Sequence, residues 1–215
     1  KLMAPEWEEV PVNLQLIGDH SIKAAAAAAC VGAKLGLTSA QVAVGLSKVK
    51  PVPGRMQLLR GVEGSTIIDD SYNSSPLAVS AALTTLYDIE SPQRIALLGS
   101  MNELGKLSSQ LHEKVGALCD PAKLDWVVTV GEEAEKYLAT AAAKKGCQVK
   151  SFKSPYDAGG FVHKVMKQDA VILVKGSQNR VFTEEAIKEL LHSTADEEKL
   201  VRQTPAWLAK KALQF

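Results

Sequence analysis

The sequence has no long apolar run, since no stretch approaches the roughly 20 residues that cross a bilayer. It also lacks an excess of charge of either sign, with 25 Lys and Arg against 24 Asp and Glu in 215 residues and a net charge of +1. Without a basic field, neither nucleic acid nor an anionic membrane is an expected partner. Any anion that binds must be held by a few local groups.

Cysteine is scarce, and the three residues form neither a metal-ligand pair nor an even disulfide framework. Cys30, Cys119 and Cys147 each lie near small or apolar residues, which favours buried structural thiols. This usage suits a reducing cytoplasm. No secretory signal is visible at Lys1, and because Met stands only third we expect a fragment of a longer chain.

Familiar catalytic motifs are missing as well. Neither a GxxxxGK[ST] phosphate loop nor a GxGxxG dinucleotide loop occurs in the sequence, and no Ser-His-Asp arrangement has local support. His112 and His163 fall inside predicted helices as core or surface residues. His20 lies between a predicted strand and a helix and is kept as a candidate contact. No residue is assigned to a metal.

The hydrophobic pattern predicts an α/β fold. Short apolar runs alternate with helical segments at 77–87, 107–118, 132–144, 156–166 and 181–191. The runs themselves lie at 56–62, 65–68, 94–98, 126–130, 148–152 and 170–174, and the first two predict a hairpin. Residues 55–192 are therefore predicted to form a Rossmann-like, mostly parallel sheet with helices on both faces.

Residues 1–47 have a different organisation. They predict a half-buried strand at 10–16 and helices at 20–34 and 39–46, the second with a capping box at Thr38–Gln41. This segment has no sheet of its own to cover, so we interpret it as the closing piece of a larger domain. The sequence KVKPVPG at 48–54 predicts a hinge linker. Residues 193–215 are predicted to be a charged, amphipathic tail.

The most informative stretch is GSTIIDDSYNSSP, in which a predicted strand ends in two carboxylates. A carboxylate accepts two hydroxyl hydrogen bonds, which is the geometry a ribose presents. Tyr72 and Asn73 are placed to flank a planar base. The same residues also fit a capped turn, with Ser75 as the N-cap and Pro76 at the first helical position, and both interpretations stay open.

Three further segments carry candidate chemistry. Arg55 follows Pro-Gly and is either a bidentate phosphate donor or a solvated surface arginine. In the loop GSMNELG, Glu103 either orients an ammonium group or belongs to an ordinary capped loop. The segment KGSQNR offers a cation, a glycine and a hydroxyl that suit a carboxylate or a phosphate.

Taken together, four segments resemble the C-terminal domain of the Mur ligase family, over about residues 16–191. They are GRMQLL, IIDDSYNSSP, ALLGSMNELG with the following His112-x-x-Val115-Gly116, and ILVKGSQNRVFTEE. The resemblance is greatest to family members that add D-Ala-D-Ala to UDP-MurNAc-tripeptide in peptidoglycan synthesis. It implies a cytoplasmic, ATP-dependent amide-bond ligase that works through an acyl phosphate.

The resemblance also implies a domain arrangement and residue roles. Residues 1–47 would end the central domain, whose missing part supplies the P-loop and the Mg²⁺ ligands, and a missing N-terminal domain would bind the UDP-sugar. The chain alone is then expected to be inactive. The implied catalytic residues are Arg55 and Lys175, the nucleotide-binding residues are His20, Asp70, Tyr72 and Asn73, and the substrate-binding residues are Ser177 and Glu103.

Four positions depart from the family pattern. Two asparagines that help to bind adenine are replaced by Ser21 and Ala24, an Asp by Ser100, and an Arg by Gln178. Two other functions therefore stay open. One is a Mur ligase relative with a different amine or a folate substrate, and the other is a non-catalytic nucleotide-binding or interaction module.

Overall fold

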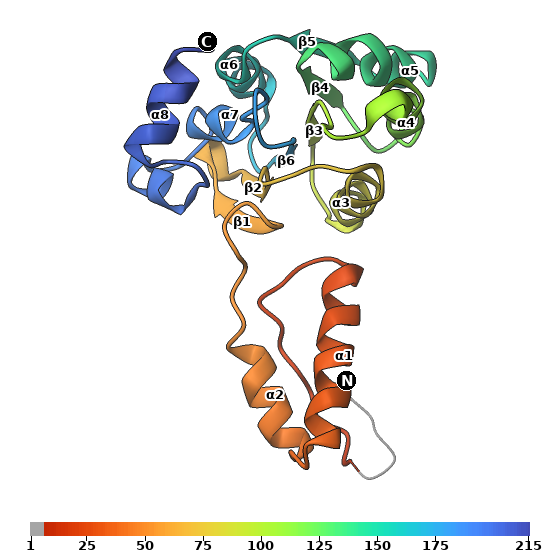
Figure 1. The fold of residues 1–215 in the computed structure, drawn as a ribbon, viewed down its shortest axis with the longest axis vertical. Coiled ribbons are helices and arrows are strands. Elements are labelled where there is room, and N and C mark those ends of the chain that lie inside the picture. The colour runs from red at the N-terminus through yellow and green to blue at the C-terminus, as the bar shows by residue number, and fades with distance from the viewer. Residues whose placement is uncertain (1–6) are drawn as a thin grey trace. The chain divides into compact units, whose positions relative to one another are not determined.

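A computed structural model describes residues 7–215 of the chain. The chain divides into two compact units, Lys1–Val52 and Pro53–Phe215, and the division falls within the predicted linker at 48–54. Figure 1 traces both units along the chain. Each unit is described by itself below.

The first unit is a pair of helices, α1 (Asp19–Lys34) and α2 (Ser39–Ser47). The predicted capping box is confirmed, because Thr38 Oγ1 accepts from Gln41 N at 3.3 Å and Gln41 Oε1 accepts from Thr38 N at 2.9 Å. The predicted strand at 10–16 is wrong, because residues 11–17 belong to no strand. The alternating apolar side chains, such as Val12 and Leu14, nevertheless pack against the two helices. Alternation here therefore reflects one buried side of an extended segment and not a strand in a sheet.

The second unit contains a six-stranded sheet in the order β1-β2-β6-β3-β4-β5. The strands are β1 (Gln57–Arg60), β2 (Thr66–Asp70), β3 (Arg94–Gly99), β4 (Trp126–Val130), β5 (Val149–Phe152) and β6 (Val171–Lys175). Only the β1–β2 pair is antiparallel, which confirms the predicted hairpin and the mostly parallel sheet. A mostly parallel sheet is normally covered on both faces, and helices cover both faces of this one.

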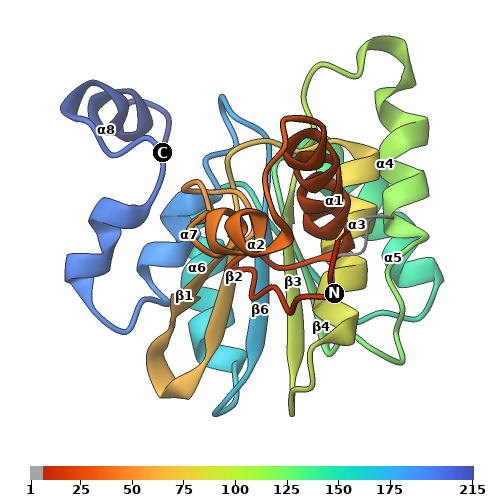
Figure 2. The same ribbon diagram turned by 90° about the horizontal axis from the view of Figure 1, so that it is seen from below.

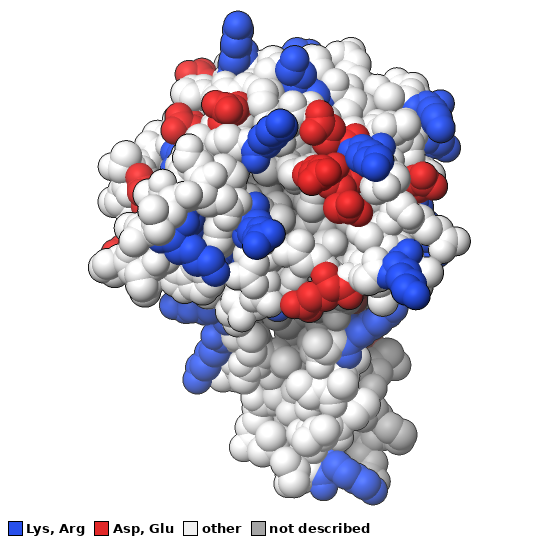
Figure 3. Space-filling view, turned by 45° about the horizontal axis from the view of Figure 1, so that its top comes forward, with Lys and Arg blue, Asp and Glu red and all other residues white. Residues whose placement is uncertain are grey.

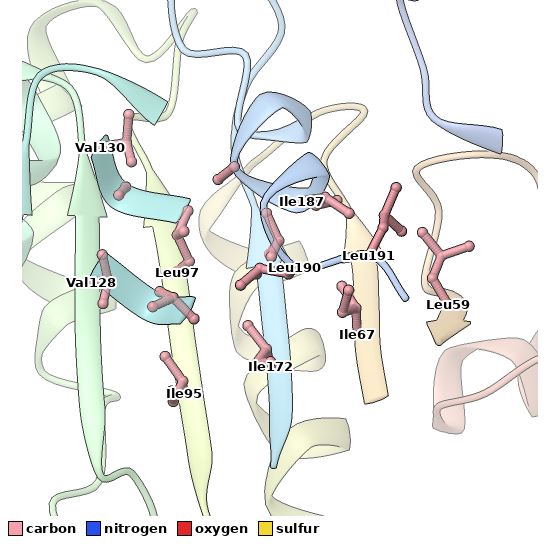
Figure 4. Packing of buried hydrophobic residues seen from close by; sticks show 14 of the residues in the cluster. Leu59, Ile67, Ile95, Leu97, Val128, Val130, Ile172, Ile187, Leu190 and Leu191 are labelled. Carbon is pink, nitrogen blue, oxygen red and sulfur yellow. The ribbon is translucent and has the colours of Figure 1, made fainter. Parts of the chain in front are cut away.

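Helices cover both faces of the sheet (Figure 2). On one face lie α3 (Pro76–Asp88), α4 (Ser108–Gly116) and α5 (Thr140–Lys144), the last continuing a π-helical segment, Ala134–Ala139. On the other face lie α6 (Pro155–Val165) and α7 (Glu184–Lys188). Figure 4 shows the core beneath α6 and α7, where strand residues such as Ile67, Leu97 and Ile172 meet Ile187 and Leu190 of the α7 segment.

The predicted helix at 181–191 is much shorter in the structure. Asn179, Arg180 and Phe182 have φ angles of 58°, 64° and 46°, which a right-handed helix cannot include, and α7 begins only at Glu184. The predicted apolar face is still correct, since all five of its residues are buried: Phe182, Ala186, Ile187, Leu190 and Leu191. Burial was predicted correctly and the extent of the helix was not.

The tail after residue 192 is ordered in two steps, a 3-10 segment at Thr194–Lys199 and α8 (Pro205–Ala212). Within the part of the chain that the structure describes, no helix has the length and apolar character needed to cross a membrane. The cysteine prediction is correct for Cys119 and Cys147, which are buried, and wrong for Cys30, which is exposed on α1.

Candidate functional site

The site lies at the carboxyl ends of β2 and β6, where ligands bind in open α/β sheets. Asp70 and Lys175 face each other in the register of these neighbouring parallel strands. Lys175 Nζ is 2.5 Å from Asp70 Oδ2 and 3.0 Å from the carbonyl oxygen of Asn73, and Asp70 Oδ1 accepts from Met56 N at 3.2 Å. One buried pair thus joins β1, the β2–α3 loop and β6.

Burial dominates the electrostatics of this pair. The side chains of Lys175 and Asp70 are 1% and 8% exposed. Burial lowers the pKa of Lys175, while the charge and hydrogen bond of Asp70 act against that shift and Arg55 adds to it. Both oxygens of Asp70 already accept a hydrogen bond within the protein. Any ribose hydroxyl must therefore use the lone pairs that remain.

The Arg55 side chain is exposed to solvent and stacks over the Tyr72 ring. Its guanidinium carbon is 4.3 Å from the ring centroid, a cation–π contact that a freely solvated arginine does not make. Tyr72 N donates to Gly54 O at 3.1 Å, and the side chain is 41% exposed. Gly54 has φ 68°, and a Cβ there would lie 3.0 Å from Tyr72 N, so only glycine allows this approach.

The polar residues that follow serve as a cap. Ser75 Oγ accepts from Ala78 N at 3.4 Å and Pro76 opens α3, which confirms the interpretation of a capped turn. Asn73 Oδ1 accepts from Ser74 N at 2.9 Å. Tyr72 and Asn73 are therefore presented on a loop that is fixed at both ends, by the cap and by Lys175.

Ser177 links two loops instead of facing solvent. It is fully buried, and its Oγ accepts from Asn102 N at 2.8 Å. Asn102 Nδ2 in turn donates to the carbonyl oxygens of Gln178 and Asn179, at 2.5 and 2.9 Å. The Ser177 oxygen already accepts one hydrogen bond, so the predicted contact with a substrate would use its O–H or its second lone pair.

The loop after β3 borders a cavity. The cavity measures about 440 Å³ and is lined by Glu103, Lys106, Glu133 and Tyr137 together with neighbouring backbone. Glu103 is exposed and has φ 65°. The loop is held by His112, whose Nε2 accepts from Met101 N at 2.9 Å, so this histidine is a core residue, which was one of its two predicted positions.

Three further sequence positions have other surroundings. His20 is exposed on the first turn of α1, in the other unit. Ser21 Oγ donates to Ile17 O at 2.9 Å, and Ser100 Oγ accepts from Ala134 N at 3.0 Å, so both departing serines have structural partners. The structure thus brings Arg55, Asp70, Tyr72, Asn73 and Lys175 together, with Ser177 and Glu103 on adjoining loops.

Asp69 is a buried carboxyl that sequence reasoning treated only as the partner of Asp70. Burial raises its pKa to about 6, a shift opposed by the backbone N–H of Ser71 and supported by the charge of Glu184. Oδ1 accepts from Ser71 N at 3.0 Å, whereas Oδ2 has no hydrogen-bond partner among the described residues. Ionisation of the Asp69 carboxyl therefore destabilises the folded state.

Sequence reasoning missed the contribution of the tail. Arg202 donates to the carbonyl oxygens of Ser71 at 2.8 Å and Tyr72 at 3.1 Å, and it forms a salt bridge with Glu184. The available signal was the pair Glu184-Glu185 within an apolar segment, since buried carboxylates require basic partners. Nothing in the sequence showed which basic residue would supply that charge.

On the face of the molecule drawn in Figure 3, the Lys and Arg side chains are spread over the surface and form no single basic patch. Among residues 7–215, no group of three or more His, Cys, Asp or Glu side chains is arranged to hold a metal ion.

Comparison with known proteins gives a consistent family. The model of the "Mur ligase, glutamate ligase domain" matches residues 54–178. The UDP-N-acetylmuramoyl-tripeptide--D-alanyl-D-alanine ligase of Bacillus subtilis is 31% identical over 183 residues, covering 84% of this chain and 40% of that protein. Its Escherichia coli counterpart is 36% identical over 124 residues, covering 58% of this chain and 27% of that protein.

Solved structures agree. The MurF ligase of Thermotoga maritima in complex with ADP superimposes with a TM-score of 0.70 at 26% identity, covering 85% of this chain and 39% of that one. MurF from Acinetobacter baumannii gives a TM-score of 0.66 at 28% identity, covering 80% and 37%. The chain thus spans about 40% of the length of the Bacillus subtilis relative.

Proposed function

The chain belongs to the Mur ligase family, and we propose that it forms the C-terminal part of an ATP-dependent ligase that joins D-Ala-D-Ala to UDP-MurNAc-tripeptide. The named relatives share this activity, and one of the similar structures contains ADP. The peptide carboxylate would attack the γ-phosphorus of ATP and release ADP. The amine of the dipeptide would then attack the acyl phosphate, lose its proton and release phosphate.

The single observation that carries the proposal is the convergence of Arg55, Tyr72, Asp70 and Lys175 at the ends of β2 and β6. Phosphoryl transfer depends on positioned cations that meet developing negative charge. Arg55 is exposed and its planar guanidinium is oriented by the Tyr72 ring, so it is the cation suited to an ATP phosphate.

Lys175 is assigned a different part in the same proposal. Its ammonium already donates to Asp70 and Asn73, and its side chain is 1% exposed. It therefore orders the loop that carries Tyr72 and Asn73 from behind. Asp70 acts with Lys175 and offers its remaining lone pairs to the nucleotide.

The first unit supports the idea of a longer chain. Its helices and the residue after α1 expose several large apolar side chains, and exposed apolar surface of this kind marks a face that packs against other protein. These are Ile22 at 59%, Val31 at 59%, Leu35 at 75% and Val44 at 54% exposure. We propose that this unit ends the central ATP-binding domain, with the phosphate loop, the Mg²⁺ ligands and the UDP-sugar domain supplied by other segments of the ligase.

We further place this ligase in the cytoplasm. Cys30, Cys119 and Cys147 are all free thiols, which suits a reducing compartment. Burial also raises the pKa of the Cys119 thiol to about 12, so that thiol stays protonated and inert at neutral pH.

The test uses the full-length protein that contains this chain, with ATP, UDP-MurNAc-tripeptide and a panel of amine acceptors. We expect phosphate release and a pentapeptide product with D-Ala-D-Ala, and neither with the 215-residue chain alone. A preference for glutamate or a folate substrate would favour another branch of the family. Absence of turnover with every acceptor, with nucleotide binding retained, would favour the binding module.

A further inference from the structure

The tail at residues 193–215 lies outside the region that the family model matches, residues 54–178. It contributes to the site all the same. Arg202 donates from Nη2 to Ser71 O at 2.8 Å and from Nη1 to Tyr72 O at 3.1 Å. Two successive carbonyl oxygens of the β2–α3 loop are therefore held by one side chain, which fixes the orientation of both peptide planes.

Arg202 is itself held rigidly. Its Nε and Nη2 donate to the two oxygens of Glu184 at 2.8 and 2.7 Å, in the bidentate geometry that arginine prefers. The Arg202 side chain is 7% exposed and that of Glu184 is fully buried. The backbone φ of Arg202 is 56°, a left-handed conformation that the surrounding contacts must maintain.

Lys211 of α8 completes this arrangement from the other end of the tail. Its Nζ lies 2.9 Å from Glu184 Oε1, 2.5 Å from Glu185 Oε1 and 2.8 Å from the carbonyl oxygen of Arg202. Burial pushes the pKa of Glu185 upward, but hydrogen bonds from Lys188, Lys211 and Gln203 outweigh it and the pKa is lowered. The network is charged, buried and satisfied, which makes it rigid.

The same tail also contacts the strained loop after β6. Lys210 Nζ is 3.2 Å from Asn179 Oδ1, and Gln214 Nε2 donates to Arg180 O at 2.6 Å. The Phe182 ring meets Trp207 and Phe215 edge-on, at centroid distances of 6.1 and 6.4 Å. In Figures 1 and 2, α8 lies on the same side of the sheet as α7.

The tail also reaches the point where the second unit begins. A Cβ at Gly54 would lie 2.9 Å from Val201 Cγ1, so the residue before Arg202 packs against the residue before Arg55. The Tyr72 ring then has Arg55 at 4.3 Å and Arg202 at 5.9 Å from its centroid. Both cations that contact the ring thus depend on the position of the 71–72 backbone.

We propose that the 193–215 tail acts as a clamp on the candidate nucleotide loop, and that Arg202 is the positioning residue that orients Tyr72 and, through it, Arg55. This inference rests on the proposed ligase function for its effect on catalysis. The geometric part, ordering of the loop by Arg202, concerns the chain itself and is tested without any activity.

The first experiment measures amide hydrogen exchange over residues 70–76 in the 215-residue chain. Arg202→Lys keeps a cation but loses the fork that reaches both carbonyls, so exchange in this segment is expected to rise by about tenfold, in line with loss of about one charge-assisted hydrogen bond. Lys199→Gln is the matched control, since Lys199 lies in the same tail, is exposed and forms its ion pair with the partly exposed Asp196. Equal exchange in Arg202→Lys and wild type would overturn the clamp.

A double variant tests the clamp in case Arg202→Lys misfolds. Replacing both partners, as Glu184→Met with Arg202→Met, removes the ion pair without leaving a buried charge unpaired, and Lys211 keeps Glu185 as its partner. The clamp predicts a folded chain, by melting temperature, whose 70–76 segment exchanges faster. A folded double variant with wild-type protection would contradict it.

The second experiment measures kinetics in the full-length ligase. Arg202→Lys is expected to raise KM for ATP by about tenfold, corresponding to one weakened charge-assisted contact, and to leave KM for D-Ala-D-Ala within about twofold. A purely structural role would lower the amount of folded enzyme and leave both KM values unchanged, which would refute the catalytic part. If wild type has no ligase activity, the proposed function fails while the exchange result still decides the clamp.

Discussion

At the scale of single residues, Asp69 carries the clearest pH dependence. Its pKa is raised from 3.8 in the unfolded chain to about 6 in the fold, so the folded state binds a proton more tightly than the unfolded state. Stability from this group is present below about pH 4 and is lost as the pH rises through about 6. At neutral pH the ionised, buried carboxylate costs at most about 3 kcal/mol.

Asp69→Asn is therefore expected to stabilise the chain above about pH 7, by up to about 3 kcal/mol, and to have little effect near pH 4. An asparagine keeps an oxygen for the Ser71 N–H and carries no charge. Urea unfolding at both pH values measures the difference, with exposed Glu113→Gln as the control. A stabilisation that does not change between the two pH values would disprove the assigned cause.

The Asp70–Lys175 pair supplies a second residue-scale prediction. Lys175→Met leaves a buried carboxylate without its ammonium and is expected to lower the free energy of unfolding by about 3–5 kcal/mol, as is Asp70→Ala. The double variant is expected to cost much less than the sum, because no unpaired charge is left. Chemical denaturation of all four chains gives the coupling energy.

The more exposed pair Asp196–Lys199 is the matched control for this cycle. Its side chains are 22% and 48% exposed at an N–O distance of 2.6 Å, and its coupling is expected to be below about 1 kcal/mol. If the buried pair couples no more strongly than the exposed one, it does not organise the loop. Sequence alone placed both buried residues at strand ends, but their pairing became visible only from the register of β2 and β6.

At the scale of elements, the close approach of α6 and α7 rests on one of two adjacent glycines. A Cβ at Gly159 would lie 2.6 Å from Ala186 O, whereas a Cβ at Gly160 meets nothing within 4 Å. Gly159→Ala is expected to destabilise the chain by about 1–3 kcal/mol through overpacking. Gly160→Ala is expected to stabilise it by about 0.5–1 kcal/mol through helix propensity.

Thermal unfolding of the two alanine variants provides the comparison, since they differ by one position in the same helix. Opposite signs are expected. Two stabilised variants would mean that α6 and α7 are not in close contact at this point, and two destabilised variants would mean that the helix ends near Gly160.

The elements also show what a sequence can and cannot predict. The strands and most helices of the second unit followed from apolar runs and cap residues such as Ser75 and Pro76, because these signals are local. The 181–191 segment did not, because Asn179, Arg180 and Phe182 adopt left-handed backbone that is held by contacts with distant residues, namely Asn102 and the tail. Arg202 was missed for the same reason, since its partners lie 18 and 131 residues away along the chain.

At the scale of the whole molecule, we propose that this chain supplies one edge of an ATP site whose phosphate loop belongs to other segments. We propose Arg55 as the cation at this edge, because its guanidinium is exposed and stacks on the Tyr72 ring. Because its cation–π contact is worth only about 0.5–1 kcal/mol at an exposed site, its loss should hardly affect the fold. Its loss should affect the reaction strongly, since the charge it meets develops in the transition state.

The most direct test is kcat and melting temperature of the Arg55→Ala variant in the full-length ligase, with exposed Arg60→Ala on β1 as the control. The account predicts that kcat falls by about a hundredfold or more, the cost of removing one preorganised charge donor, while the melting temperature stays close to that of wild type. An unchanged kcat, or a loss of activity that matches a loss of folded protein, would contradict it.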